Sequence, residues 1–83
     1  MNPTVLVAED DPVQRLLLRR ALEPLGVEVR LARHGREALD LALEGPPHLV
    51  LTDLHMPYMD GLELTRRLKA LDPLLPVLLL TAD

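Results

Sequence analysis

Cysteine is absent from this 83-residue sequence, and Tyr58 is the single residue among Phe, Trp and Tyr. Without cysteine the chain can form neither a disulfide nor a thiolate metal site. A chain of this length buries only about 60–65 % of its unfolded surface, so one small domain spanning residues 1–83 is the upper limit. Leucine and valine must form its core, within a hydrophobic fraction of 48 %.

Basic residues are also few, with 9 Lys and Arg against 13 Asp and Glu, which gives a formal net charge of −4. Proteins that bind nucleic acid usually have a basic patch, so we expect no nucleic-acid partner. The apolar runs are too short to cross a bilayer, and the N-terminus lacks the pattern of a secretion signal. We therefore expect a cytoplasmic protein with no membrane partner.

Four short apolar runs alternate with three segments of helical periodicity. The run 4–8 is almost wholly apolar, which predicts a strand buried on both faces of a parallel sheet. The run 27–31 alternates between apolar and polar residues, which predicts an edge strand. Further strands are predicted over 48–52 and 76–81, and helices over 13–25, 35–44 and 61–71.

Local signals mark where these helices begin and end. Asp11 and Pro12 predict the start of the first helix, because a carboxylate caps free N–H groups and proline needs no acceptor in the first turn. Gly26 predicts the end of that helix, and Asp60 predicts the start of the third. The apolar positions at helical spacing are Val13, Leu16, Leu17, Ala21 and Leu25, then Ala38, Leu39, Leu41 and Ala42, then Leu62, Leu64, Leu68 and Leu71.

The order of elements is β-α-β-α-β-α-β, which predicts an α/β fold with a parallel sheet and right-handed crossovers. Ligand sites in such sheets form beyond the carboxyl ends of the strands. Glu9 and Asp10 follow the first strand and Asp53 follows the third, so three carboxylates converge if these strands are neighbours. Such a cluster needs a cation, and its oxygen ligands favour Mg²⁺ or Mn²⁺ over zinc.

Each acid also has a plainer interpretation when it is considered alone. Asp11 before Pro12 is an ordinary helix cap. Glu9 and Asp10 are equally compatible with a solvated loop, and an aspartate such as Asp53 is common after an apolar strand. The order of the fold is what makes the acids informative together, because it brings them to one point.

Three segments resemble bacterial response-regulator receiver domains. Residues 5–12 (VLVAEDDP), followed by Arg15, resemble the opening of that family. Residues 53–61 (DLHMPYMDG) resemble its phosphorylation loop, and residues 77–82 (VLLLTA) resemble its fourth strand and switch threonine. The resemblance covers the whole chain and implies a flavodoxin-like open parallel sheet in the order 2-1-3-4.

The resemblance also implies a role for individual residues. Asp53 would accept a phosphoryl group from a phosphohistidine on a histidine kinase or phosphotransfer protein. Asp10, Asp53 and the backbone carbonyl of His55 would bind Mg²⁺ directly, and Glu9 would bind it through water. Thr81 would be the switch residue that hydrogen-bonds the phosphoryl group. The protein would then be a signalling module and not an enzyme.

Two further positions follow from the same match. His55 and Asp83 occupy the variable positions, two residues beyond the acceptor aspartate and the switch threonine, that tune hydrolysis of the acyl phosphate. The other two histidines, His34 and His48, are expected to have structural roles.

The family pattern continues beyond Asp83 with a helix, a strand and a helix, which normally include a phosphate-binding lysine and an aromatic switch residue. We therefore expect this chain to be the N-terminal portion of a receiver, truncated after the fourth strand. The first helix should cover one face of the sheet and the other two helices the opposite face. Alternate residues of 49–51 and 77–80 should then face water, leaving strand 4 as an apolar edge that forms a homo-oligomer.

Three hypotheses follow for the function. The first is a Mg²⁺-dependent signalling module phosphorylated on Asp53. The second is a truncated receiver without efficient phosphotransfer that acts as an interaction or dimerisation unit. The third is a phosphatase with an aspartyl nucleophile, which ranks last because that chemistry requires a second acid at the position of His55.

Overall fold

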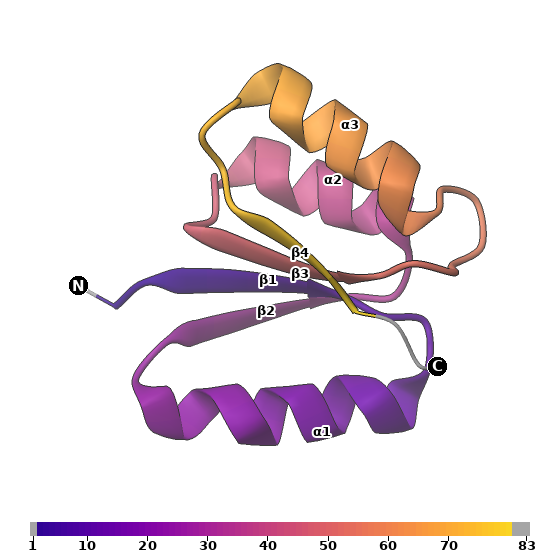
Figure 1. Ribbon diagram of the computed structural model, residues 1–83. Helices are drawn as coiled ribbons and strands as arrows, with labels where there is room; N and C mark the ends of the chain where they lie inside the picture. The colour runs from indigo at the N-terminus through magenta and orange to yellow at the C-terminus, as the bar shows by residue number, and fades with distance from the viewer. Residues whose placement is uncertain (1, 81–83) are drawn as a thin grey trace.

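Four parallel strands form the centre of the molecule. The computed structural model describes residues 2–80. Its single sheet has the order β2-β1-β3-β4, as Figure 1 shows, which confirms the predicted topology. The strands are β1 (Thr4–Ala8), β2 (Glu28–Ala32), β3 (Leu49–Asp53) and β4 (Val77–Leu80).

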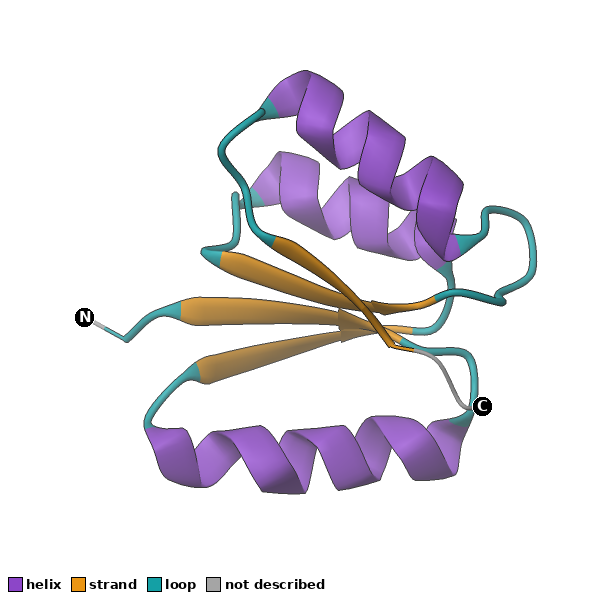
Figure 2. Ribbon diagram, viewed as in Figure 1, coloured by secondary structure: helices purple, strands orange, loops and turns teal. Residues whose placement is uncertain are grey.

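Helices cover both faces of this sheet, giving three layers (Figure 2). One face is covered by α1 (Pro12–Leu22), and the other by α2 (Gly35–Glu44) and α3 (Gly61–Leu71), as the sequence predicts. The layers follow from the crossovers, since a right-handed connection between parallel strands must cross one face or the other. The chain moves in one direction across the sheet from β1 to β2 and in the opposite direction from β2 to β3 and β4. The helix of the first connection, α1, therefore lies on the face opposite α2 and α3.

The first helix is shorter than the sequence predicts. The α-helix ends at Leu22, and Glu23–Leu25 forms a separate 3-10 turn, η1. Pro24 explains the break, because proline has no N–H to donate and its ring clashes with the carbonyl four residues earlier. Gly26 ends η1 at a positive φ of 81°, a backbone conformation that glycine adopts without strain.

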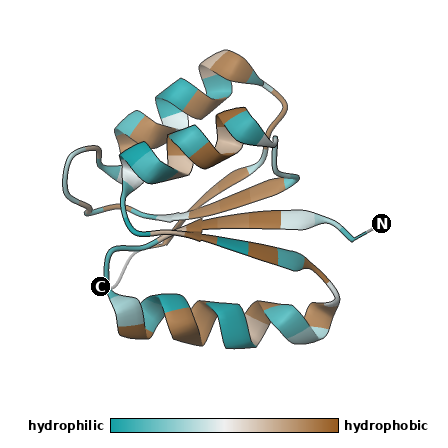
Figure 3. Ribbon diagram, turned by 180° about the vertical axis from the view of Figure 1, so that it is seen from behind, coloured by the Kyte–Doolittle hydropathy of each residue, from teal (hydrophilic) through white to brown (hydrophobic). Residues whose placement is uncertain are grey.

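The larger core lies between the sheet and the pair α2 and α3. The strand residues Leu6 and Val50 pack there against Leu64 and Leu68 of α3, and all four are essentially inaccessible to solvent. The hydropathy colours of Figure 3 show mostly apolar strands, except for the edge strand β2 beside α1, which mixes polar and apolar residues as the helices do. The apolar face of each helix thus packs against the apolar residues of the central strands, as expected for a buried parallel sheet.

The outer apolar positions of the third helix are exceptions. The spacing predicts that Leu62 and Leu71 share the apolar side of Leu64 and Leu68, but their side chains are about half exposed. Leu64 and Leu68 lie four residues apart and therefore share one face of α3, which packs against the sheet. Leu62 and Leu71 lie at the edges of that face, so the buried face is narrower than the sequence suggests.

The smaller core lies under α1, and here the apolar positions chosen from the sequence mostly fail to contact the sheet. Val13, Leu16, Leu17 and Leu25 are exposed. The residues that pack against the buried strand residues Val5, Val7 and Leu51 are instead Leu18 and Leu22, and they are only partly buried. No residue of α1, which the structure describes in full, is buried.

The uncovered part of this face is smaller than predicted. Leu51 is buried, contrary to the expectation for alternate residues of 49–51, because it lies among Leu18, Leu80 and the neighbouring strand residues. In β4 the exposed residues are the neighbours Leu78 and Leu79, which point to opposite faces of the sheet, whereas the sequence predicts exposure of alternate residues. No helix within residues 2–80 is long and apolar enough to span a bilayer.

Candidate functional site

Three carboxylates meet at the carboxyl ends of β1 and β3. These strands are neighbours, with Ala8 beside Thr52, so the residues that follow them are brought together. Carboxylate oxygens of Glu9, Asp10 and Asp53 all lie within 4.8 Å of one another. The predicted convergence of these acids is therefore present, and it follows from the strand order. Glu9 is only 6 % exposed, Asp53 is half-buried and Asp10 is exposed.

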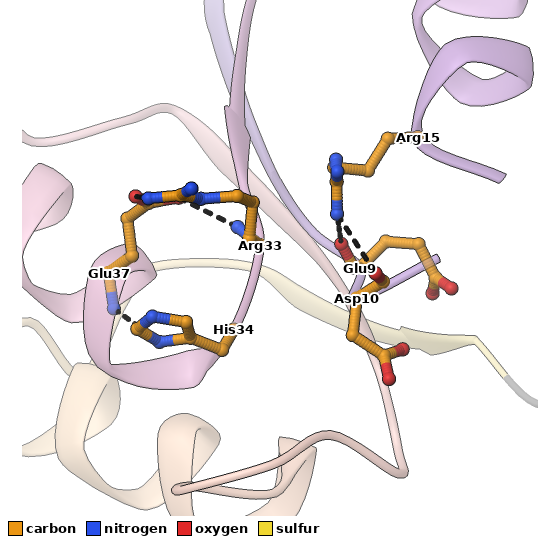
Figure 4. Close-up of polar contacts among 6 residues, drawn as sticks. All are labelled: Glu9, Asp10, Arg15, Arg33, His34 and Glu37. Carbon is orange, nitrogen blue, oxygen red and sulfur yellow. Dashed lines mark hydrogen bonds and ion pairs between the residues drawn. The ribbon is translucent and has the colours of Figure 1, made fainter. Parts of the chain in front are cut away.

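Main-chain contacts hold the two acids after β1. The N–H of Glu9 donates to the carbonyl of Ala32 (3.0 Å), which extends the β1–β2 ladder by one residue. Arg15 of α1 donates from Nη1 to the carbonyl oxygens of Glu9 (2.8 Å) and Asp10 (3.0 Å), as Figure 4 shows. The sequence shows Arg15 as part of a family motif, but it does not show that this side chain binds the main-chain carbonyls of Glu9 and Asp10. Only the fold shows that its side chain reaches back over the turn.

Helix capping explains the third acid of the run. Asp11 accepts a hydrogen bond from the N–H of Val13 (2.9 Å), which is the N-cap interaction predicted from the Asp-Pro pair. Its own N–H donates to Oε1 of Glu9 (3.3 Å). Asp11 therefore starts α1, while Glu9 and Asp10 are left free to point toward Asp53.

Burial raises the pKa of Glu9 to about 7, although the N–H of Asp11 opposes the shift. A hydrogen bond with Asp53 and the charges of Asp53 and Asp10 contribute smaller parts of the same upward shift of this pKa. A carboxyl in this position resists ionisation near neutral pH unless a positive charge is added. The cluster is therefore suited to a hard divalent cation with oxygen ligands, and Mg²⁺ fits both the donor set and its partly open geometry.

A cleft of about 540 Å³ opens beside the acids on the α1 face of the sheet. Its acidic end offers carboxylate oxygens, and Leu18 and Leu80 form the apolar part of its lining. A bound group would therefore meet the carboxylates at one end only. The lining residues are Glu9, Asp10, Asp11, Gln14, Leu18, Asp53 and Leu80.

The loop from β3 to α3 begins at Asp53 and is held at both ends. Asp53 accepts from the N–H of Leu54 through Oδ1 (2.8 Å), and the N–H of Gly61 donates to the carbonyl of Leu54 (2.9 Å). A Cβ at Gly61 would collide with the carbonyl oxygen of Asp53, so α3 can start this close to the end of β3 only with glycine. Asp60 caps α3 as predicted, accepting from the N–H of Glu63 (2.8 Å).

The turn from β2 to α2 supports the middle of this loop. Tyr58 has a positive φ of 68° and packs edge-on against His34, with ring centroids 5.0 Å apart. A Cβ at Gly35 would collide with the main chain of Met59. Sequence reasoning missed this support. The positive φ at a tyrosine has no sequence signal, because such backbone conformations are uncommon for bulky residues.

His34 and His48 have structural roles, as the sequence predicts. His34 caps α2, accepting through Nδ1 from the N–H of Glu37 (3.1 Å), beside the Arg33–Glu37 ion pair seen in Figure 4. His48 accepts from the N–H of Thr4 through Nδ1 (2.9 Å) and so connects the start of β3 to β1. His55 is exposed in the loop after Asp53. Thr81 and Asp83 lie outside the described residues.

Comparison with known proteins agrees with this geometry. The family model described as the response regulator receiver domain matches residues 5–83. The chain belongs to this family. It is 47 % identical over 82 residues to the response regulator MprA of Mycolicibacterium vanbaalenii, covering 99 % of this chain and 36 % of the relative. This receiver thus spans about a third of the length of that relative.

Two further similarities extend the comparison. The sensor protein EvgS of Escherichia coli is 44 % identical over 80 residues, which cover 96 % of this chain and 7 % of that protein. The chemotaxis protein CheY4 of Vibrio cholerae has a solved structure that matches all of this chain and 71 % of its own, with a TM-score of 0.94 and 29 % identity. The protein is therefore a receiver domain of two-component signalling with a flavodoxin-like fold.

Proposed function

We propose that this receiver accepts a phosphoryl group on Asp53 from a phosphohistidine of a histidine kinase or phosphotransfer protein. A carboxylate oxygen of Asp53 forms a bond to phosphorus while the P–N bond breaks, and its electron pair returns to the imidazole nitrogen. The product is an acyl phosphate on Asp53. The observation that carries the proposal is the cluster of Glu9, Asp10 and Asp53 within 4.8 Å at the ends of two neighbouring strands.

Mg²⁺ is the cofactor that suits this step. Asp10, Asp53 and the backbone carbonyl of His55 would hold it directly, and Glu9 would hold it through water. When bound, the ion neutralises negative charge on the phosphoryl oxygens and keeps the carboxylates ionised. Arg15 holds the main chain of Glu9 and Asp10 in place. The hydroxyl of Thr81 would donate a hydrogen bond to an oxygen of the transferred phosphoryl group.

Intact mass measurement with a small phosphodonor tests the proposal. We expect a gain of one phosphate in the presence of Mg²⁺, and none when the metal is chelated. Asp53→Asn should abolish the gain. Asp60→Asn is the matched control, since asparagine still caps α3 and Asp60 lies outside the acidic cluster. Phosphorylation that persists in Asp53→Asn would contradict the assignment of the acceptor.

A second candidate function is an interaction or dimerisation unit that does not require phosphotransfer. It is favoured by β4, which forms one edge of the described sheet and exposes Leu78 and Leu79. An apolar edge strand of this kind can pair with another chain. If this second candidate holds in place of the first, light scattering at high micromolar concentration shows a homo-oligomer, and Leu79→Lys dissociates it. A monomeric mass under these conditions would exclude pairing through strand 4.

A further inference from the structure

The outer surface of α2 and α3 has two apolar hollows, on the face opposite the acidic cleft. One hollow of about 450 Å³ lies between the two helices, and another of about 340 Å³ lies at their carboxyl ends. Leu43 and Leu71 line both hollows, so the hollows form one continuous patch. Each of these leucines is 58 % exposed. Leucines that share a hollow and remain this exposed are typical of an interaction surface.

The two helices that border this patch have opposite charges. α2 contains one basic residue and three acidic residues, which gives a net charge of −2. α3 contains three basic residues and one acidic residue, which gives a net charge of +2. The intrahelical pairs Arg36–Asp40 and Arg67–Glu63 are exposed and stabilise the chain little. These pairs leave the net charges of −2 on α2 and +2 on α3 unchanged, and those charges attract a surface of the complementary pattern.

A second copy of this chain has that pattern. We propose that two copies associate face to face through the α2–α3 surface, about a two-fold axis parallel to the helices. Both helices run in the same direction, because each connects two parallel strands. Rotation about such an axis places α2 of one copy on α3 of the other, so acidic and basic helices meet twice.

The alternative two-fold axis is disfavoured by charge. An axis across the helices would place α2 on α2 and α3 on α3, so that like charges face each other. The axis along the helices also keeps both carboxyl ends at the same level. Leu43 of one copy then meets Leu71 of the other at the centre of the apolar patch. The apolar contact alone does not fix the relative orientation of the two copies, and the charges of α2 and α3 favour the axis along the helices.

The expected association is weak and leaves the acidic cleft open. Helices of 10 and 11 residues are each about 15 Å long, so the contact is smaller than the roughly 800 Å² per partner of a standard interface. The cleft lies on the α1 face, where Leu18 and Leu80 line it. This inference is therefore independent of whether Asp53 is phosphorylated.

Sedimentation of the whole 83-residue chain from low to high micromolar concentration tests the contact. We expect a monomer–dimer equilibrium that Leu43→Glu weakens by about tenfold or more. Leu25→Glu is the matched control on the α1 side, where Leu25 is also exposed, and it should leave the equilibrium unchanged. Leu79→Lys should likewise have no effect. A chain that stays monomeric, or a dimer lost in Leu79→Lys but kept in Leu43→Glu, would overturn the inference.

Charge exchange tests the orientation. Asp40→Lys and Arg67→Glu, each made alone, should weaken self-association. Mixing the two variants should restore it, because in the mixed dimer each α2–α3 contact again joins opposite charges. Circular dichroism of each variant confirms that it remains folded. If mixing restores nothing while both variants are folded, α2 does not face α3 of the second copy and the proposed axis is wrong.

Discussion

The two faces of the sheet differ in how completely helices cover them. On the α2–α3 face, Leu64 and Leu68 are buried against the strands, and two helices share the surface. On the α1 face, a single helix contributes only the partly buried Leu18 and Leu22. The acidic cleft opens on this second face, beside Leu18. Hydrophobic stabilisation is therefore concentrated on one side of the sheet, and the side on which the acidic cleft opens is loosely packed.

Removing one core leucine from each face should show the largest difference. Leu64→Ala should lower the free energy of unfolding by about 4 kcal/mol, because its side chain is fully buried. Leu18→Ala should lower it by only about 1 kcal/mol, since this leucine already contacts water. Urea denaturation followed by circular dichroism measures both. Equal losses would mean that the two faces contribute equally and that the comparison is wrong.

Adding a methyl group at a glycine of each side sharpens the same contrast. Gly61→Ala should cost about 3 kcal/mol, because the new Cβ collides with the carbonyl oxygen of Asp53 and pushes α3 away from β3. Gly26→Ala on the α1 side should cost about 1 kcal/mol, since its only penalty is the positive φ and no atom lies within 4 Å of a Cβ there. Thermal unfolding ranks the two variants. A larger loss at Gly26 would contradict the packing argument.

The charge of Glu9 adds a pH dependence to the loosely packed side. The folded pKa of about 7 lies above the ordinary value of 4.5, so the folded state binds more protons between these values. Stability without metal should therefore be greatest below about pH 4.5 for this group and should fall as pH rises to about 7. Glu9→Gln should remove that decline and gain about 2 kcal/mol at alkaline pH.

Urea unfolding at several pH values, in chelator, measures the effect of Glu9→Gln. Glu44→Gln is the control, because Glu44 is an exposed glutamate at the end of α2. Added Mg²⁺ should stabilise the native protein above pH 7 and should do so much less in Glu9→Gln. A decline with pH that is the same in Glu9→Gln would place its origin in other groups.

The smallest effects are expected at the N-caps of α1 and α3. The two capping hydrogen bonds are similar, but α1 is packed more loosely against the sheet than α3. Asp11 and Asp60 each accept one N–H at the start of α1 and α3, at 2.9 and 2.8 Å. Asp60→Ala should lower global stability by about 1 kcal/mol. Asp11→Ala should cost less globally and should instead speed amide hydrogen exchange in α1, since a loosely packed helix opens locally. Equal global losses without local exchange would show that α1 unfolds together with the rest.

Much of the fold could be predicted because its signals are local. The boundaries of the strands and of α2 and α3 lie within about two residues of those expected from periodicity and capping. The convergence of Glu9, Asp10 and Asp53 was predicted on the condition that β1 and β3 are neighbours, and the strand order that meets this condition came from the family resemblance. The failures concern contacts that depend on more than one element.

Two such failures, and one local signal that was missed, are instructive. Leu16 and Leu17 have the spacing of a buried stripe, yet Leu18 and Leu22 face the sheet, because a leucine-rich helix offers several apolar stripes and only its placement selects one. The end of α1 at Leu22 was missed although Pro24 could have indicated it. The support of Tyr58 by His34 joins residues 24 positions apart and left no trace in either local pattern.

The types and order of the elements, the helix caps and the identity of the acidic residues all follow from the chain's local pattern, because each depends on neighbouring residues alone. Burial and proximity do not. The raised pKa of Glu9, the clamp from Arg15 and the exposure of Leu43 and Leu71 depend on which elements cover one another in space. The pKa of the same carboxyl would stay at its ordinary value in an open loop, and it rises only where the fold removes water and adds two further acids.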